Sequence, residues 1–194
     1  MVIRITLALL CISLPLLLTT SCLQSPNNST IGTPVDSLNA VTVYFSQAPG
    51  DPDFEGLSPE LQDLALSLSS TEFVKRYYKS VFGVEFPDSL RRGVDFYDPD
   101  IPDGEVNPKT GLIQYTRPSI APPRKNDIMV FNDARYNPGG HLAIVAEVSR
   151  QEIVIVQQSP DPLSKTREPL RYYIRRKKWY VQHPHAAAWL HKEE

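Results

Sequence analysis

His141 is the residue of this sequence best suited to acid–base chemistry. It follows Gly139-Gly140 directly and opens the apolar run from Leu142 to Val145, a pattern that indicates a turn leading into a buried strand. An imidazole can take or give a proton near neutral pH. From these residues alone, however, a structural histidine is the preferred interpretation.

Gln157 is the residue expected to lie beside that histidine. It ends the apolar run from Ile153 to Val156, and Arg150-Gln151 predicts a tight reversal between this run and the strand of His141. Antiparallel pairing of the two runs then places His141 and Gln157 on neighbouring strands. An amide there can fix the tautomer of the imidazole, but it cannot stabilise an imidazolium as a carboxylate does.

Hydroxyl side chains begin the second of two predicted helices. Ser58-Pro59-Glu60 starts the first helix, which is expected to reach about Leu68. The second is expected from Ser69 or Ser70 to Phe82, with Gly83 ending it. Its apolar residues repeat with the spacing of one buried stripe: Phe73, Val74, Tyr77, Tyr78 and Val81.

The rest of the chain predicts a loop and then β-structure, so the fold class is α+β with N-terminal helices packed on an antiparallel sheet. Residues 87–123 contain seven prolines and predict a long ordered loop with one short helix. A short strand is expected over residues 41–45, and the later strands over residues 127–132, 141–148, 152–158, 172–174 and 179–182.

The first residues predict export. Arg4 precedes an apolar run from Ile5 to Leu18, which is shorter than the roughly 20 residues of a membrane span and indicates a signal peptide over residues 1–21. Cys22 resembles the acylated cysteine of a bacterial lipobox, although Thr19 stands where leucine is usual. An ordinary cleaved signal is the alternative. Residues 22–40 are polar and predict a flexible tether, with one folded domain over residues 41–194.

Four motifs, in this order, resemble the CHAP family of cysteine, histidine-dependent amidohydrolases and peptidases. They cover about residues 58–192 and are closest to the branch with glutathionylspermidine amidases and cell-wall endopeptidases. The motifs are Ser70-Thr71-Glu72-Phe73-Val74-Lys75-Arg76, Pro122-Pro123-Arg124-Lys125-Asn126-Asp127-Ile128, Gly140-His141-Leu142-Ala143-Ile144-Val145, and Ala188-Trp189-Leu190-His191. In the second motif Asn126 stands where the family has glycine.

The resemblance implies a papain-like fold and a set of site positions. The nucleophile position falls on Ser70, with Ser69 and Thr71 as alternatives, the base on His141 beside Gly140, and the orienting residue on Gln157. Ser159 falls where that branch often has asparagine. No cysteine stands at the nucleophile position, because the only other cysteine, Cys11, lies in the predicted leader. A serine hydroxyl is a much weaker nucleophile than a thiolate.

Three functions remain open from the sequence. The preferred one is a lipid-anchored envelope protein whose degenerate domain binds a cell-wall peptide or a protein partner without cutting it. The second is an active amidase or peptidoglycan endopeptidase that uses Ser70 and His141. The third is an envelope protein with a vestigial cleft, in which Arg175-Arg176-Lys177-Lys178 binds an anionic surface.

No cofactor, metal or nucleic-acid partner is expected. The formal net charge of -2 gives no global attraction for nucleic acid. The proline-rich loop has five acidic residues, and their spacing is wrong for a calcium loop: Asp95, Asp98, Asp100, Asp103 and Glu105. His183-Pro184-His185 lacks partner cysteines for zinc.

Overall fold

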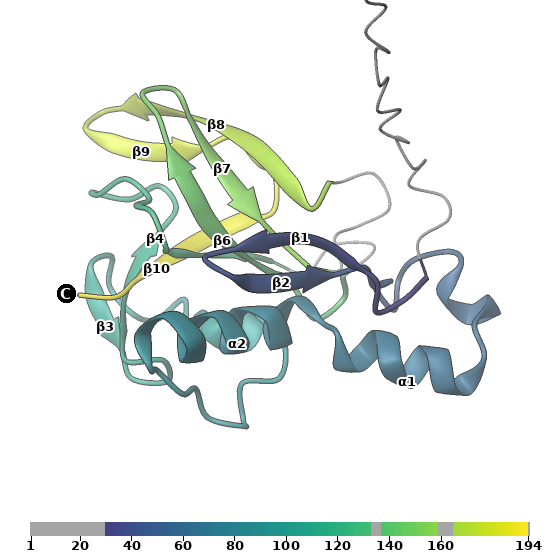
Figure 1. Ribbon diagram of the computed structural model, residues 1–194. Coiled ribbons are helices and arrows are strands. Elements are labelled where there is room, and N and C mark those ends of the chain that lie inside the picture. The colour runs from purple at the N-terminus through teal and green to yellow at the C-terminus, as the bar shows by residue number, and fades with distance from the viewer. Residues whose placement is uncertain (1–29, 133–136, 159–164, 194) are drawn as a thin grey trace, which may run out of the picture.

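The computed structural model describes residues 30–132, 137–158 and 165–193. Two α-helices and a large antiparallel sheet make up this part of the chain, which confirms the predicted α+β class (Figure 1). Both helices precede the eight strands of the large sheet in the chain, as predicted.

Both helices begin at the serines expected to cap them. In α1 (Pro59–Ser67) the Oγ of Ser58 accepts a hydrogen bond from the amide of Leu61 at 3.4 Å. In α2 (Ser70–Phe82) the Oγ of Ser69 accepts one from the amide of Glu72 at 3.2 Å. Gly83 ends α2 in the left-handed conformation, with φ 66°.

The large sheet has eight strands in the order β3-β4-β10-β5-β6-β7-β8-β9, and each neighbouring pair is antiparallel. Its strands are β3 (Glu105–Asn107), β4 (Leu112–Thr116), β5 (Ile128–Phe131), β6 (His141–Val148), β7 (Glu152–Val156), β8 (Arg167–Arg175), β9 (Lys178–Val181) and β10 (Ala186–His191). The reversal expected at Arg150-Gln151 joins β6 to β7.

The central strands are buried on both faces, which explains why their sequences are continuously apolar. On one face, the stripe of Phe73, Val74, Tyr77 and Tyr78 from α2 packs on alternate residues of β5, β6 and β10. On the other face, Trp189 and Ile155 pack with residues of β8 and β9. The sheet curls to cover this second face, because Ser119, just after β4, exchanges two backbone hydrogen bonds with Trp179 of β9.

Part of the range predicted as a flexible tether is instead folded. β1 (Pro34–Leu38) pairs with β2 (Val41–Tyr44) as a hairpin, and Asp36 forms an ion pair with Arg167 of β8 at 3.1 Å. The prediction rested on the polar composition of the segment. It missed that a two-residue turn at Asn39-Ala40, both with positive φ, pairs this segment with an apolar strand.

The predicted loop over residues 87–123 also contains more structure than expected. It carries the 3₁₀ helix η3 (Gly93–Phe96) and the short strands β3 and β4. Buried amide side chains hold it: Asn107 donates to the carbonyl of Phe96 and to the Oε1 of Gln114, both at 3.0 Å. A second 3₁₀ helix, η2, spans Phe54–Gly56.

Candidate functional site

The structure brings His141 and Gln157 together as expected from the sequence. His141 is the first residue of β6, and Gln157 follows the last residue of β7. The Nε2 of His141 lies 2.9 Å from the Oε1 of Gln157, and both side chains are buried. Because an amide oxygen only accepts, Nε2 carries a proton in this contact.

Ser70 lies against the same end of β6. It is the first residue of α2, it is 7% exposed, and its Oγ accepts a hydrogen bond from the amide of Leu142 at 3.2 Å. Leu142 follows His141 directly, so Ser70 lies beside the backbone of the histidine. Of the two alternatives for this position, Ser69 is the helix cap and Thr71 is the second helical residue.

Close backbone packing fixes the position of His141. Gly140 has φ 74°, and a Cβ atom there would come within 2.7 Å of the carbonyl oxygen of Phe131. A Cβ atom on Gly93 of η3 would come within 2.6 Å of the amide nitrogen of His141. Both positions therefore require glycine. Gly140 allows the chain just before His141 to approach the backbone of Phe131 and Val94 closely.

Gln157 has two further partners. Its Nε2 donates to the carbonyl of Lys165 at 2.8 Å and lies 3.2 Å from the Oε2 of Glu168 on β8. A carboxylate thus stands behind the amide that contacts the histidine. No local pattern in the sequence points to Glu168, because only the pairing of β7 with β8 places it there.

Gln158, to which no sequence pattern points either, joins three elements. Its Oε1 accepts from the amide of Tyr44 at 2.9 Å, and its Nε2 donates to the Oε2 of Glu72 at 3.0 Å. Glu72 forms an ion pair with Arg76 at 2.7 Å. These bonds fix the start of α2 on β2 and on the end of β7, and so they hold Ser70 against β6.

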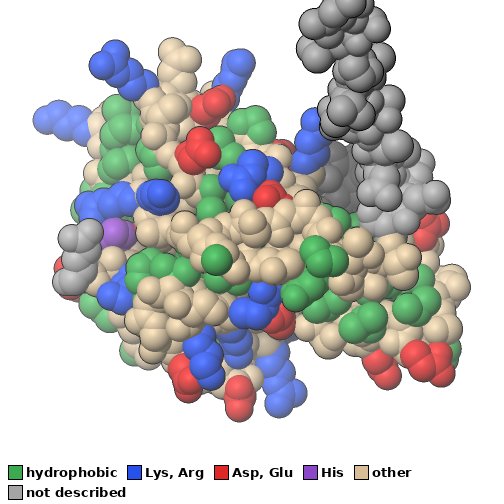
Figure 2. Space-filling view, in the orientation of Figure 1, with side chains coloured by type: hydrophobic (Ala, Val, Ile, Leu, Met, Phe, Trp, Pro, Cys, Tyr) green, Lys and Arg blue, Asp and Glu red, His purple; other side chains and the backbone are tan. Residues whose placement is uncertain are grey.

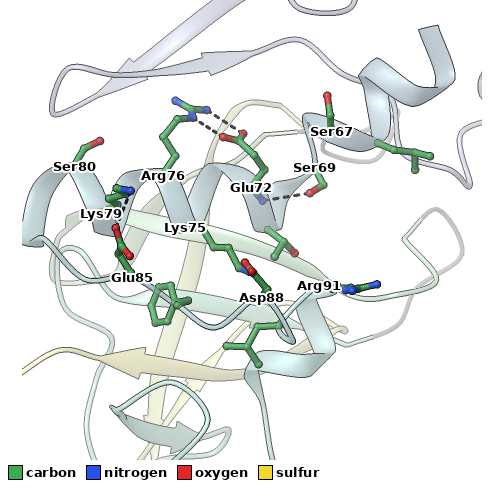
Figure 3. A pocket seen from close by; sticks show the side chains of 14 residues that line it. Ser67, Ser69, Glu72, Lys75, Arg76, Lys79, Ser80, Glu85, Asp88 and Arg91 are labelled. Atoms are coloured by element: carbon green, nitrogen blue, oxygen red, sulfur yellow. Dashed lines mark hydrogen bonds and ion pairs between the residues drawn. The ribbon is translucent and has the colours of Figure 1, made fainter. Parts of the chain in front are cut away.

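A surface pocket of about 550 Å³ lies on the outer side of α2 (Figure 3). One wall is the helix from Ser69 to Ser80, and the other is the segment from Glu85 to Arg91. Its side chains carry both signs of charge, and Lys79 is paired with Glu85 at 2.7 Å. The pocket begins beside the start of α2, but Ser70 does not line it, because Ser70 points to the sheet.

Asn126 lies in a turn just before β5. Its φ is 72°, a left-handed conformation that glycine adopts most easily and asparagine next. The hydroxyl of Tyr77 lies 2.8 Å from its side-chain oxygen, and that of Tyr78 donates to its carbonyl oxygen at 2.8 Å. The asparagine therefore suits both the backbone conformation and the two tyrosines of α2.

Asp127, the next residue, forms a second polar cluster. Its carboxylate lies 2.7 Å from the Nδ1 of His191 and accepts from the amide of Arg124 at 2.7 Å. The guanidinium of Arg124 lies 2.9 Å from the Nε2 of the same histidine. Burial raises the pKa of Asp127 from 3.8 to about 6, against the hydrogen bonds from His191 and Arg124, which lower it.

Three acidic residues of the proline-rich loop, Asp95, Asp98 and Asp103, have partners within the chain, and Asp95 pairs with Arg92 at 2.9 Å. Asp103 accepts from the hydroxyl of Ser119 and from the amides of Thr116 and Ile120, while Asp98 pairs with Lys109 at 3.0 Å. Within residues 30–132, 137–158 and 165–193, no group of three or more acidic, histidine or cysteine side chains could hold a metal ion.

Two predicted positions, Cys22 and Ser159, lie outside the described residues, as does the predicted leader. In the part of the chain that is described, no helix is long and apolar enough to cross a membrane. Neither a protein-family model nor a curated protein matches this sequence.

Proposed function

We propose that this protein is a lipid-anchored component of a bacterial envelope, with a papain-like domain similar to CHAP amidases that binds a cell-wall peptide or a protein partner without cutting it. The order of elements supports the papain-like assignment: the nucleophile position begins a helix, the histidine begins a strand, and its orienting residue directly follows the next strand.

One observation carries the non-catalytic part of the proposal. The oxygen of Ser70, which would have to attack a carbonyl carbon, accepts a backbone hydrogen bond from Leu142. This bond draws electron density from the oxygen and holds it against the strand. In addition, the partner of His141 is a neutral amide, and loss of the charge at this position in a serine triad lowers turnover about 10⁴-fold.

A serine hydrolase that uses Ser70 and His141 is the second candidate. The observation that favours it is Glu168, whose carboxylate lies 3.2 Å from the amide nitrogen of Gln157. This negative charge, one side chain removed from the imidazole, would stabilise an imidazolium more weakly than a direct contact does.

The Ser70→Cys variant tests the proposal. The variant places a thiol at the positive end of the α2 dipole, where a thiolate is favoured. We expect it to cleave purified cell wall or short peptide amides, because the cysteine–histidine pair of papain-like proteases works with a neutral amide as its third residue. The natural chain should bind the same fragments in a calorimetric titration and leave them intact.

Ser80→Cys is the matched control, because it adds a thiol to the same helix in the last turn, away from His141. It should show no cleavage. If the natural chain cuts and Ser70→Ala does not, the protein is a serine hydrolase and the proposal is wrong.

A further inference from the structure

The hairpin of β8 and β9 ends in four consecutive cations. Arg175 pairs with Lys178 at the end of the ladder, and Arg176 and Lys177 form the turn. All four are exposed, and none of their side chains makes an ion pair or hydrogen bond with another residue in the described ranges. Figure 2 shows Lys and Arg side chains that project at the upper left, where Figure 1 places this hairpin.

The backbone of this turn is strained. Arg176 has φ 52° and Lys177 has φ 59°, so both central residues of the turn are left-handed. Asn-Gly is the favoured pair in such turns, whereas a residue with a long side chain costs about 1–2 kcal/mol. The turn between β1 and β2 has the same signs of φ but begins with an asparagine, Asn39. At the β8–β9 turn, Arg176 and Lys177 stand at positions where asparagine and glycine would cost less conformational free energy.

Apolar and aromatic side chains lie directly behind the cations. Ile174 is 57% exposed and Tyr173 is 42% exposed. Tyr173 stacks on Tyr180 of β9 with the ring centroids 5.0 Å apart, and Trp179 is half-buried opposite Ile174. Tyrosine and tryptophan with neighbouring lysine or arginine are typical of segments that lie in the headgroup region of a bilayer.

We infer that the tip of the β8–β9 hairpin, residues 173–180, is a docking surface for a bilayer that contains anionic phospholipid. The exposed cations complement the phosphates, and the exposed Ile174 and Tyr173 reach the boundary of the acyl chains. Nucleic acid fits less well, because a phosphate backbone offers no apolar region for the exposed Ile174. The inference does not depend on the site of Ser70 and His141.

The test uses the full chain and the fluorescence of Trp179, because the only other tryptophan, Trp189, is fully buried. The probe is a vesicle of phosphatidylcholine with one third phosphatidylglycerol, compared with phosphatidylcholine alone. We expect a blue shift of the emission with the anionic vesicles only, which Trp179→Phe abolishes and which high salt weakens.

The double variant Arg176→Asn/Lys177→Gly separates binding from folding. It introduces the favoured turn pair, so the protein should resist urea at least as well as the natural chain. Its affinity for anionic vesicles should fall roughly 25-fold, because each cation near such a surface contributes about fivefold. The matched control, Arg91→Gln/Lys125→Gln, removes two exposed charges elsewhere and should retain the affinity.

Equal affinity of the turn variant and the natural chain would overturn the inference. So would an equal blue shift with vesicles that lack phosphatidylglycerol. Displacement of the chain from anionic vesicles by a short RNA duplex at micromolar concentration would assign the surface to nucleic acid instead, and the inference would also be wrong.

Discussion

At the scale of single residues, the side chain of Gln157 accepts a hydrogen bond on one side and donates one on the other. Its oxygen accepts from His141, while its nitrogen donates to the carbonyl of Lys165 and approaches the carboxylate of Glu168. An amide can accept on one side and donate on the other, whereas a carboxylate can only accept. The neutral side chain of Gln157 therefore matches its surroundings, and a carboxylate there would not.

Exchange of the amide and the carboxylate tests this account. Gln157→Glu should lower the free energy of unfolding by about 1–3 kcal/mol, because it turns acceptors toward Lys165 and Glu168. Gln157→Glu/Glu168→Gln restores a donor and should recover most of that loss. Urea denaturation of the two single variants and the double variant gives the coupling energy. Additive losses would contradict the account.

The sequence predicted the contact between His141 and Gln157, since two apolar runs around a tight turn fix their register. It could not predict Glu168, because residues 157–166 separate that strand from β7 and leave its register open. The bond from Leu142 to Ser70 joins residues 72 positions apart and depends on how α2 lies on the sheet. Such contacts follow from tertiary packing, which a local pattern does not contain.

At the scale of elements, the turn just before β6 leaves no room for a side chain at Gly140. Gly140 has φ 74° and touches both Phe131 and Val94, whereas Gly83, with φ 66°, faces open space at the end of α2. The two glycines therefore share the conformation and differ in their surroundings.

A pair of alanine substitutions separates these two effects. Gly83→Ala should lower the free energy of unfolding by about 1–2 kcal/mol, from conformation alone. Gly140→Ala should cost about 1–3 kcal/mol more, because the added Cβ must displace the backbone of β5 or η3. Chemical denaturation measures both. Equal losses would show that the contacts at Gly140 relax without cost.

The helices could be predicted closely because capping serines, an apolar stripe and a final glycine all mark them locally. The long strands were predicted too, but β8 extends over Arg167–Arg175 and not only residues 172–174. β1, β3, β4 and β10 were missed, although β10 lies between β4 and β5 in the middle of the sheet. β1, β3 and β4 are short, and each is stabilised by a partner strand and not by its own composition.

At the scale of the whole molecule, the cluster of Asp127, His191 and Arg124 joins the start of β5 to the last residue of β10. The pKa of the buried carboxyl is raised to about 6, so the folded state holds this proton more tightly than the unfolded chain does. Stability from this group is full below pH about 4 and is lost as the pH rises through 6.

Replacement of the carboxyl should remove this pH dependence. Relative to Asp127→Asn, the natural protein should lose up to about 3 kcal/mol of unfolding free energy between pH 4 and pH 7. His191→Gln keeps the carboxyl buried and should retain the dependence. Urea denaturation at several pH values measures all three proteins. A difference that is constant with pH would mean that Asp127 stays ionised in the folded state.

The position of the first described residue limits how far the domain could stand from a membrane if Cys22 were acylated as proposed. The described part of the chain begins at Thr30, eight residues after Cys22. Even fully extended, eight residues span no more than about 28 Å, whereas a domain of this size measures about 40 Å across. A protein acylated at Cys22 would therefore stay close to the bilayer surface. It would be within reach of the headgroups and out of reach of distant cell-wall layers.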